Sequence, residues 1–303
     1  MSEAAEDKGW LGVAEKGSAW GIATTVWLAT VAGRPAARLL IRVVALWYTL
    51  LHPGVRRASR SWWQRLEGKN PSLLTIYRHV LRFAQVVLDR CFFVQGKFDL
   101  FTIERDGHQH LVDLHATGRG ALLLSAHIGS TEAMAAGGYH DLLKIRVVGY
   151  FKNAAMINAA LGKLDPKSAT RVVSIEPGSA DSVLAIRDRI EAGQLLAVAG
   201  DRIGLSDRTV TAEFFGEPAR FATGPFLLAA ILKCPVYFVC GLYEEPNKYK
   251  LFCEPFAERI DLPRKDREAA LQRYASQYAQ RLEHYARQAP DNWFNFFDFW
   301  SQS

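Results

Sequence analysis

Short apolar segments alternate with longer amphipathic segments through most of this 303-residue chain, and this alternation constrains the fold more than any other feature. The expected strands span residues 100–105, 121–126, 145–151, 171–175, 195–200, 210–215, 236–243 and 248–253. The expected helices span residues 71–93, 108–117, 130–143, 154–164, 180–192, 223–232 and 264–287. Strands separated by helices predict an α/β fold with a mostly parallel central sheet covered by helices on both faces. Ligands of such sheets bind beyond the carboxyl ends of the strands.

The first third of the chain differs from the rest in charge and hydropathy. Residues 1–90 contain 13 Lys+Arg and 6 Asp+Glu, whereas the remaining residues contain 24 and 25. This third also holds two uncharged apolar stretches, 17–33 and 43–55, bordered by arginines and tryptophans. Such a composition is typical of a helical hairpin that lies in a bilayer interface. We therefore expect residues 1–66 to be a membrane-attachment segment and residues 67–303 to be the α/β body.

Two alternatives stay open for these apolar stretches. They could be core helices of a soluble domain, or residues 17–33 could span a bilayer, for which about 20 apolar residues are needed. Nucleic-acid binding fits poorly, because the basic residues are interleaved with long apolar runs rather than placed along a polar face.

Several other classes of protein are disfavoured by missing patterns. The four cysteines form no C-x-x-C pair, which is typical of reduced, buried thiols in a cytosolic compartment. His108, His110 and His115 fit a solvated helix face, so we expect no metal site. The chain has no phosphate-binding loop, dinucleotide fingerprint, zincin motif or nucleophile elbow, and we expect no cofactor.

One histidine stands where a catalytic base is expected. The apolar strand at residues 121–125 is followed by His127, and Glu132 lies five positions further, in the first turn of the next helix. A turn through Gly129 can bring the Glu132 carboxylate beside the ring. A carboxylate on one ring nitrogen fixes the tautomer, so that the other nitrogen can remove a proton from a hydroxyl or an amine.

Spacing alone does not single out this pair. His108 and Asp113 have the same separation, but they lie within a polar helix segment and do not share a helix face. The position of His127 at the end of a strand distinguishes the two pairs. The alternative for His127 is a structural histidine that caps a turn.

The sequence resembles the lysophospholipid acyltransferase superfamily, and within it the late acyltransferases of lipid A biosynthesis and their relatives encoded with aryl-polyene pathways. The signature of that superfamily is a histidine followed after four residues by an acid, and HIGSTE at residues 127–132 matches it. A second block, an acid-led turn followed by a Phe-Gly turn and a Thr-Gly helix start, matches residues 201–224. Ser130 and Thr131 replace the Asn-Trp of many lipid A enzymes, so the aryl-polyene relatives are the nearer match.

This resemblance implies an enzyme that moves an acyl chain from a thioester donor to a lipid hydroxyl or amine without a covalent enzyme intermediate. The donor is an acyl carrier protein or an acyl coenzyme A, and the enzyme lies on the cytoplasmic face of the inner membrane. His127 is then the general base and Glu132 its orienting partner. The matching substrate-binding residues are Lys152, Asp201, Arg202, Gly216, Thr223 and Gly224.

Backbone N–H groups near Gly129 or the turn at residues 214–216 are candidates for binding the oxyanion of the tetrahedral intermediate, as is Arg202. Thr223 can cap the helix that follows it. The aromatic run at residues 293–300 is either a helix that docks on the core or a segment that lines an acyl channel or contacts the membrane. Two other functions stay open, a non-catalytic lipid-binding scaffold of the same fold and an acyl thioesterase in which His127 activates water.

Overall fold

The computed structural model describes residues 19–138, 143–149, 159, 162–164, 172–174, 180–203 and 208–300. The helices are α1 (Ala19–Val31), α2 (Gly33–Leu51), α3 (Pro53–Glu67), α4 (Leu73–Val94), α5 (Gln109–Ala116), α6 (Thr131–Gly137), α8 (Ala180–Glu191), α9 (Gly224–Leu232) and α10 (Arg267–Gln288). The strands are β1 (Thr102–Asp106), β2 (Ala121–Ser125), β3 (Ile145–Gly149), β4 (Val172–Ser174), β5 (Leu195–Ala199), β6 (Thr209–Phe214), β7 (Glu217–Ala222), β8 (Val236–Glu244) and β9 (Lys248–Ala257). Lys152 and most of the helix expected at residues 154–164 lie outside the described residues.

Seven strands form the central sheet in the order β1-β9-β8-β2-β5-β3-β4. Every neighbouring pair is parallel except β8 and β9, which form an antiparallel hairpin. β2 lies between β8 and β5, and all five of its side chains are buried. The prediction of an α/β fold with a mostly parallel sheet is therefore confirmed, with β2 at its centre.

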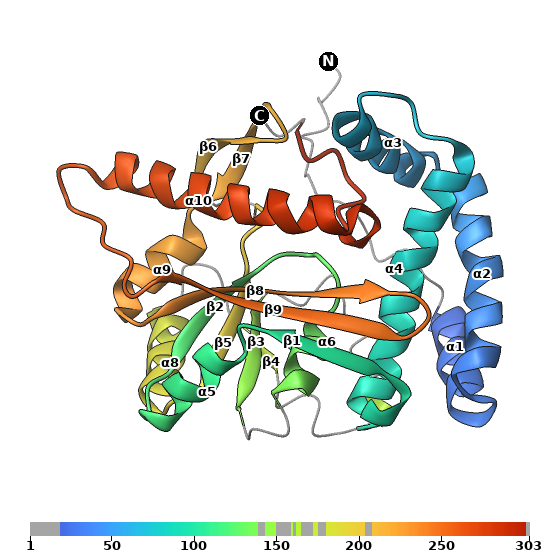
Figure 1. The fold of residues 1–303 in the computed structure, drawn as a ribbon, viewed down its shortest axis with the longest axis horizontal. Helices are drawn as coiled ribbons and strands as arrows, with labels where there is room; N and C mark the ends of the chain where they lie inside the picture. Colours follow the sequence, from blue (N-terminus) through green and yellow to red (C-terminus); the bar gives the residue numbers. More distant parts are fainter. Residues whose placement is uncertain are drawn as a thin grey trace, which may run out of the picture.

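Helices cover both faces of this sheet (Figure 1). Because side chains of a strand alternate between its two faces, Leu122 and Leu124 of β2 join one hydrophobic cluster and Leu123 joins another. The first cluster includes buried side chains of α8, α9 and α10. The second includes Leu111 and Leu114 of α5, with Met134 of α6 packed against it.

The strand expected at residues 210–215 does not join the central sheet. Instead β6 pairs with β7 in a separate antiparallel hairpin that contacts α10. The turn between them places Phe215 at a φ of 54° and Gly216 at a φ of 76°. Two consecutive residues with positive φ give the tight turn that a two-residue hairpin needs. β7 was not expected from the sequence.

The N-terminal helices pack against α4 at one side of the molecule (Figure 1). Arg34 of α2 makes two hydrogen bonds, of 2.7 and 2.9 Å, with the carboxylate of Asp89 on α4. The Asp89 side chain is fully buried and also accepts a hydrogen bond of 2.9 Å from Tyr249 on β9. This buried ion pair joins the N-terminal helices to the body, because separating it would leave an unpaired charge inside the protein.

α1, α2 and the start of α4 nevertheless expose many large apolar side chains. These are Trp20, Trp27, Val31, Leu39, Val43, Leu46, Trp47, Leu50, Leu51, Leu73 and Leu74. On α2, the residues Leu39, Val43, Leu46 and Leu50 follow a spacing that places them on one helix face. Within the described part of the chain, no helix combines the length and the hydropathy required to cross a bilayer.

Candidate active site

The carboxyl ends of two neighbouring strands bring His127 and Asp201 together. β2 and β5 run parallel with Ser125 opposite Ala199, so the residues two positions further along, His127 and Asp201, are also opposite each other. The backbone N–H of Gly200 donates to the carbonyl of Ser125 at 2.9 Å, which extends this pairing beyond the strands. Two polar side chains therefore meet at the carboxyl end of the strands, where ligands of parallel sheets bind.

The two side chains form a direct hydrogen bond. The distance between Nδ1 of His127 and Oδ1 of Asp201 is 2.7 Å. Asp201 is 1% exposed. Burial alone favours the protonated acid, but the charges of His127 and Arg202 and the hydrogen bonds from His127 lower the pKa of Asp201 to about 2. The carboxylate is therefore ionised at neutral pH and accepts a hydrogen bond from the protonated Nδ1.

The other nitrogen of the imidazole is available for chemistry. The His127 side chain is 34% exposed, and among the described residues no group forms a hydrogen bond with its Nε2. Burial of the ring, followed by the nearby Arg202 cation, lowers the pKa of His127 against the opposing effect of Asp201. A lowered pKa keeps the ring neutral at pH 7, and a neutral imidazole can accept a proton.

Glu132 lies at the start of α6 but has a different partner. Its carboxylate forms an ion pair with Arg90 of α4 at 2.5 Å and accepts a hydrogen bond of 3.1 Å from Thr131. Within the described parts of the chain, no hydrogen bond joins Glu132 to His127. The role of Glu132 as the orienting acid thus stays a prediction, whereas the geometry gives that contact to Asp201.

The C-terminal segment, residues 290–300 after α10, holds the turn that carries His127. The N–H of Phe294 donates to the carbonyl of His127 at 2.7 Å, and the N–H of Gly129 donates to the carbonyl of Asn292 at 2.8 Å. Gly129 has a φ of 63°, and a Cβ at this position would lie 1.9 Å from the carbonyl oxygen of Gly241. Only glycine fits this close approach of two backbone segments.

Two side chains of the same segment reach Asp201, and sequence reasoning missed them. The indole N–H of Trp293 and the amide N–H of Asn295 donate to Oδ2 of Asp201 at 3.1 and 3.0 Å. Asn292 and Asn295 are both buried among aromatic residues. The sequence did offer one signal, namely asparagines within an aromatic run. When such a run packs inside the protein, each amide needs hydrogen-bond partners.

Arg202 lies on the other side of Asn295. Its Nε donates to Oδ1 of Asn295 at 3.2 Å, and its Nη2 donates to the carbonyl of Phe294 at 3.4 Å. Burial lowers the pKa of Arg202 to about 10, with Asp201 opposing the shift, so the guanidinium is charged at neutral pH. A fixed cation thus stands close enough to His127 to lower its pKa.

The other sequence-predicted substrate residues lie at two turns outside this cluster. Gly216 occupies the exposed turn of the β6–β7 hairpin, where the N–H of Phe215 donates to Glu283 of α10 at 2.7 Å. Thr223 and Gly224 begin α9. Thr223 occupies the N-cap position, but its hydroxyl donates to the carbonyl of Arg208 at 3.0 Å and does not cap the helix. Their role in substrate binding stays a prediction.

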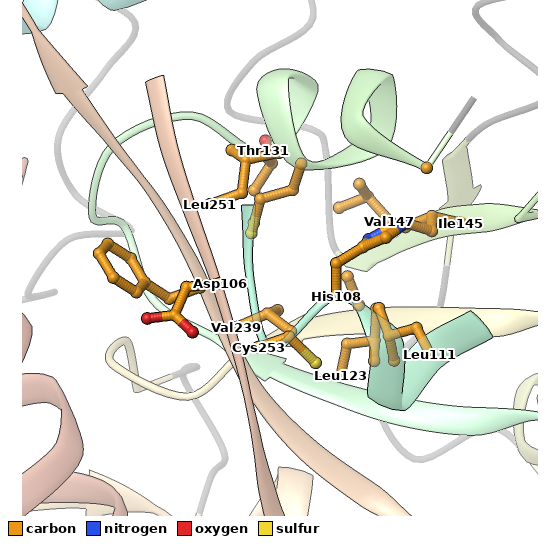
Figure 2. A pocket seen from close by; sticks show the side chains of 14 residues that line it. Asp106, His108, Leu111, Leu123, Thr131, Ile145, Val147, Val239, Leu251 and Cys253 are labelled. Carbon is orange, nitrogen blue, oxygen red and sulfur yellow. The ribbon is translucent and has the colours of Figure 1, made fainter. Parts of the chain in front are cut away.

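A mostly apolar pocket lies between α6 and the face of the sheet that carries Leu123 (Figure 2). Its lining residues are Asp106, His108, Leu111, Leu123, Thr131, Met134, Gly138, Ile145, Val147, Ala197, Val239, Leu251, Phe252 and Cys253. His127 does not line this pocket, but Thr131 does, and it directly precedes Glu132. Apolar side chains make up most of its wall.

Comparison with known proteins supplies the class of chemistry. A search of curated protein sequences found no match to this chain. The sequence model of the bacterial lipid A biosynthesis acyltransferases matches residues 97–302, which include the whole sheet and the His127–Asp201 pair. The chain thus belongs to the bacterial lipid A biosynthesis acyltransferase family and is an acyltransferase.

Proposed function

We propose that this acyltransferase moves an acyl chain from a thioester donor to a hydroxyl or amine of a lipid, with His127 as the general base. The observation that carries the proposal is the 2.7 Å hydrogen bond between Asp201 and Nδ1 of a partly exposed ring, whose Nε2 has no hydrogen bond to the described residues. Nε2 removes the proton of the acceptor while its oxygen or nitrogen attacks the thioester carbonyl. As the tetrahedral intermediate collapses, the C–S bond breaks and the imidazolium returns the proton to the leaving thiolate.

In this proposal Asp201 replaces Glu132 as the group that orients the imidazole and stabilises its cation. Arg202 provides positive charge for the oxyanion. The backbone N–H groups of Gly129, Ser130 and Phe215 are less suitable, because the single proton of each already goes to a protein oxygen. Arg202 keeps its positive charge while it donates to Asn295 and Phe294. A fixed charge in a water-poor site stabilises a developing oxyanion more than the same charge does in water.

The pocket beneath α6 is proposed to hold the alkyl part of the acyl chain. A bulkier side chain in its wall shortens the space, so Val147→Phe should shift the preferred donor toward shorter chains. The matched control is Leu184→Phe on α8, an exposed position outside the pocket. An unchanged chain-length preference of the Val147 variant would contradict this assignment.

The exposed apolar face of α1 and α2 is proposed to lie on the cytoplasmic surface of the inner membrane. Trp20 and Trp27 are 78% and 61% exposed, and exposed arginines such as Arg42 and Arg57 lie on α2 and α3. Apolar side chains enter the interface while arginines bind anionic headgroups. In this assignment residues 1–66 form the attachment segment and residues 67–303 form the body.

Sedimentation with vesicles that contain anionic lipid tests the attachment. Replacing Trp20, Trp27 and Trp47 together by Gln should release most of the protein, and high salt should weaken the binding of the wild type. Ile231→Gln on α9 is the control, because Ile231 is 58% exposed but lies on a different surface. Binding that survives the triple substitution would place the contact elsewhere.

The choice of orienting acid is tested by acyl transfer from a radiolabelled acyl thioester to a lipid acceptor. Asp201→Asn should lower kcat about 100-fold or more, whereas Glu132→Gln should have a smaller effect. The reverse order would restore Glu132 as the partner of His127. Release of free acid at the same rate with and without lipid would indicate a thioesterase, and full cellular function of His127→Ala would indicate a scaffold.

A further inference from the structure

The C-terminal segment (residues 290–300) lies over the carboxyl end of β2 and also contacts the side chain of Asp201. Trp293 forms an isolated antiparallel bridge with Ile128, directly beside His127. From this backbone position, the side chains of Trp293 and Asn295 both point to the same oxygen, Oδ2 of Asp201. The backbone N–H of His127 donates to that oxygen as well, at 2.9 Å. Three donors therefore converge on Oδ2, and Oδ1 is left for the imidazole.

We propose that Trp293 and Asn295 are positioning residues that fix the Asp201 carboxylate for its contact with His127. This inference rests on the proposed function, in which Asp201 orients the base. A carboxylate that is free to turn about its Cβ–Cγ bond can present either oxygen, or neither, to the ring. Donors that saturate one oxygen hold the carboxylate plane and keep the acid ionised inside the protein.

The orientation of Asn295 is itself determined by a second contact. Arg202 Nε donates to the carbonyl oxygen of the Asn295 amide, so the NH2 group must face Asp201. Asn295 thereby links the cation and the anion on either side of it. An aspartate or a leucine at this position cannot make both contacts.

The indole of Trp293 is held by an aromatic cluster. Its ring centroid lies 4.7 Å from that of Trp62, 5.4 Å from that of Phe214 and 5.0 Å from that of Phe299. Trp293 is 1% exposed. A ring fixed in this way presents its N–H at a constant place, and this accuracy is what an orienting contact requires.

A double-mutant cycle separates positioning from a purely structural role. Trp293→Phe removes one donor to Asp201 and keeps an aromatic ring, whereas Asn295→Leu removes the other donor together with the acceptor of Arg202 Nε and keeps a side chain of similar shape. We expect each to lower kcat about 10-fold or more, with KM for the thioester changed less than about threefold. In an Asp201→Asn background the same substitutions should lower kcat by less than about threefold, because residues that act through one another are not additive.

Trp63→Phe is the matched control. Trp63 packs against the same hydrophobic core but makes no described ring contact with Trp293, and among the described residues its indole N–H has no hydrogen-bond partner. Its kcat should stay within about twofold of wild type in both backgrounds. Melting temperatures identify any variant that fails to fold, and the second of the two substitutions then carries the test.

Each outcome is decisive. The positioning role is overturned if the two donor variants lower kcat as much in the Asp201→Asn background as in the wild type. It is also overturned if both Asn295→Leu and Trp293→Phe keep full activity. Full activity of Asp201→Asn alone overturns the proposed function instead. A low-field proton resonance of the His127 Nδ1–H gives an independent readout: it should shift or broaden in the two donor variants and stay unchanged in Trp63→Phe.

Discussion

Two histidines contact the same C-terminal segment, and their surroundings give them opposite uses. His79 on α4 is 1% exposed, with Nδ1 3.0 Å from the hydroxyl of Ser59 and Nε2 2.9 Å from the carbonyl of Trp293. His127 is partly exposed and has a carboxylate on one nitrogen only. A ring with both nitrogens committed to protein groups is a structural cross-link. A ring with one nitrogen committed and the other open can transfer a proton.

The largest effect should follow the loss of the His127 imidazole. His127→Ala removes the general base, and acyl transfer is expected to fall about 10²–10⁴-fold in a protein that still folds. The transfer assay and thermal unfolding measure the two quantities. A comparable loss of activity in a folded His79→Leu protein would erase the distinction between the two histidines.

Replacing the committed ring should affect stability instead. His79→Leu leaves the Ser59 hydroxyl and the Trp293 carbonyl buried without partners, at a cost of about 1–3 kcal/mol for each group. Chemical unfolding should show this decrease, and kcat measured at a permissive temperature should change much less than in His127→Ala. An unchanged unfolding midpoint would show that the two hydrogen bonds contribute little.

Acid should weaken the region around His79, because the unfolded chain then takes up a proton that the folded chain does not. Burial lowers the pKa of His79 to about 4, against the opposing hydrogen bond to Trp293 and the charge of Asp291, from an ordinary value of 6.5. The unfolded chain therefore binds a proton between pH 6.5 and 4 that the folded chain does not bind. Stability should fall by up to about 3 kcal/mol over this range as the pH is lowered. In His79→Leu this part of the pH dependence should be absent.

The smallest effect is a shift of the pH profile caused by the charge beside His127, and it is measured separately from the loss of kcat that removing the proposed oxyanion cation should cause. Arg202→Gln removes a cation that lowers the pKa of His127, so the pKa should rise and the acid limb of the kcat/KM profile should move to higher pH. The profile of His79→Leu is the comparison, because His79 belongs to the other site. A shift toward lower pH would mean that Arg202 acts on His127 mainly through its contact with Asn295.

The fold could be predicted largely from the sequence, because strand-length apolar runs and helix-length amphipathic runs are local patterns. The antiparallel β6–β7 hairpin could not, since a short strand such as Glu217–Ala222 has no apolar alternation to distinguish it from a loop. For the candidate site, the sequence named His127 and Asp201 but not the contact between them. His127 stands at the end of its strand, but its contact with Asp201 depends on β5 being the neighbour of β2, and strand order is a long-range property.

The same limit explains Glu132 and Asn295. Glu132 is near His127 in the sequence, yet α6 turns its carboxylate toward Arg90 of α4. Asn295 is remote in the sequence and adjacent in space. Motif spacing measures distance along the chain, and here it favoured the acid that is near in sequence over the acid that the sheet brings to the ring.

Because the bridge between Ile128 and Trp293 joins residues far apart in the sequence, the site is completed only late in synthesis. A ribosome makes the strand that carries the base when more than half of the chain is still to come, and the residues that enclose its acid follow only after α10. A polypeptide interrupted between these two points contains the histidine but no fixed carboxylate. Proteolytic loss of the segment after residue 290 should therefore abolish acyl transfer.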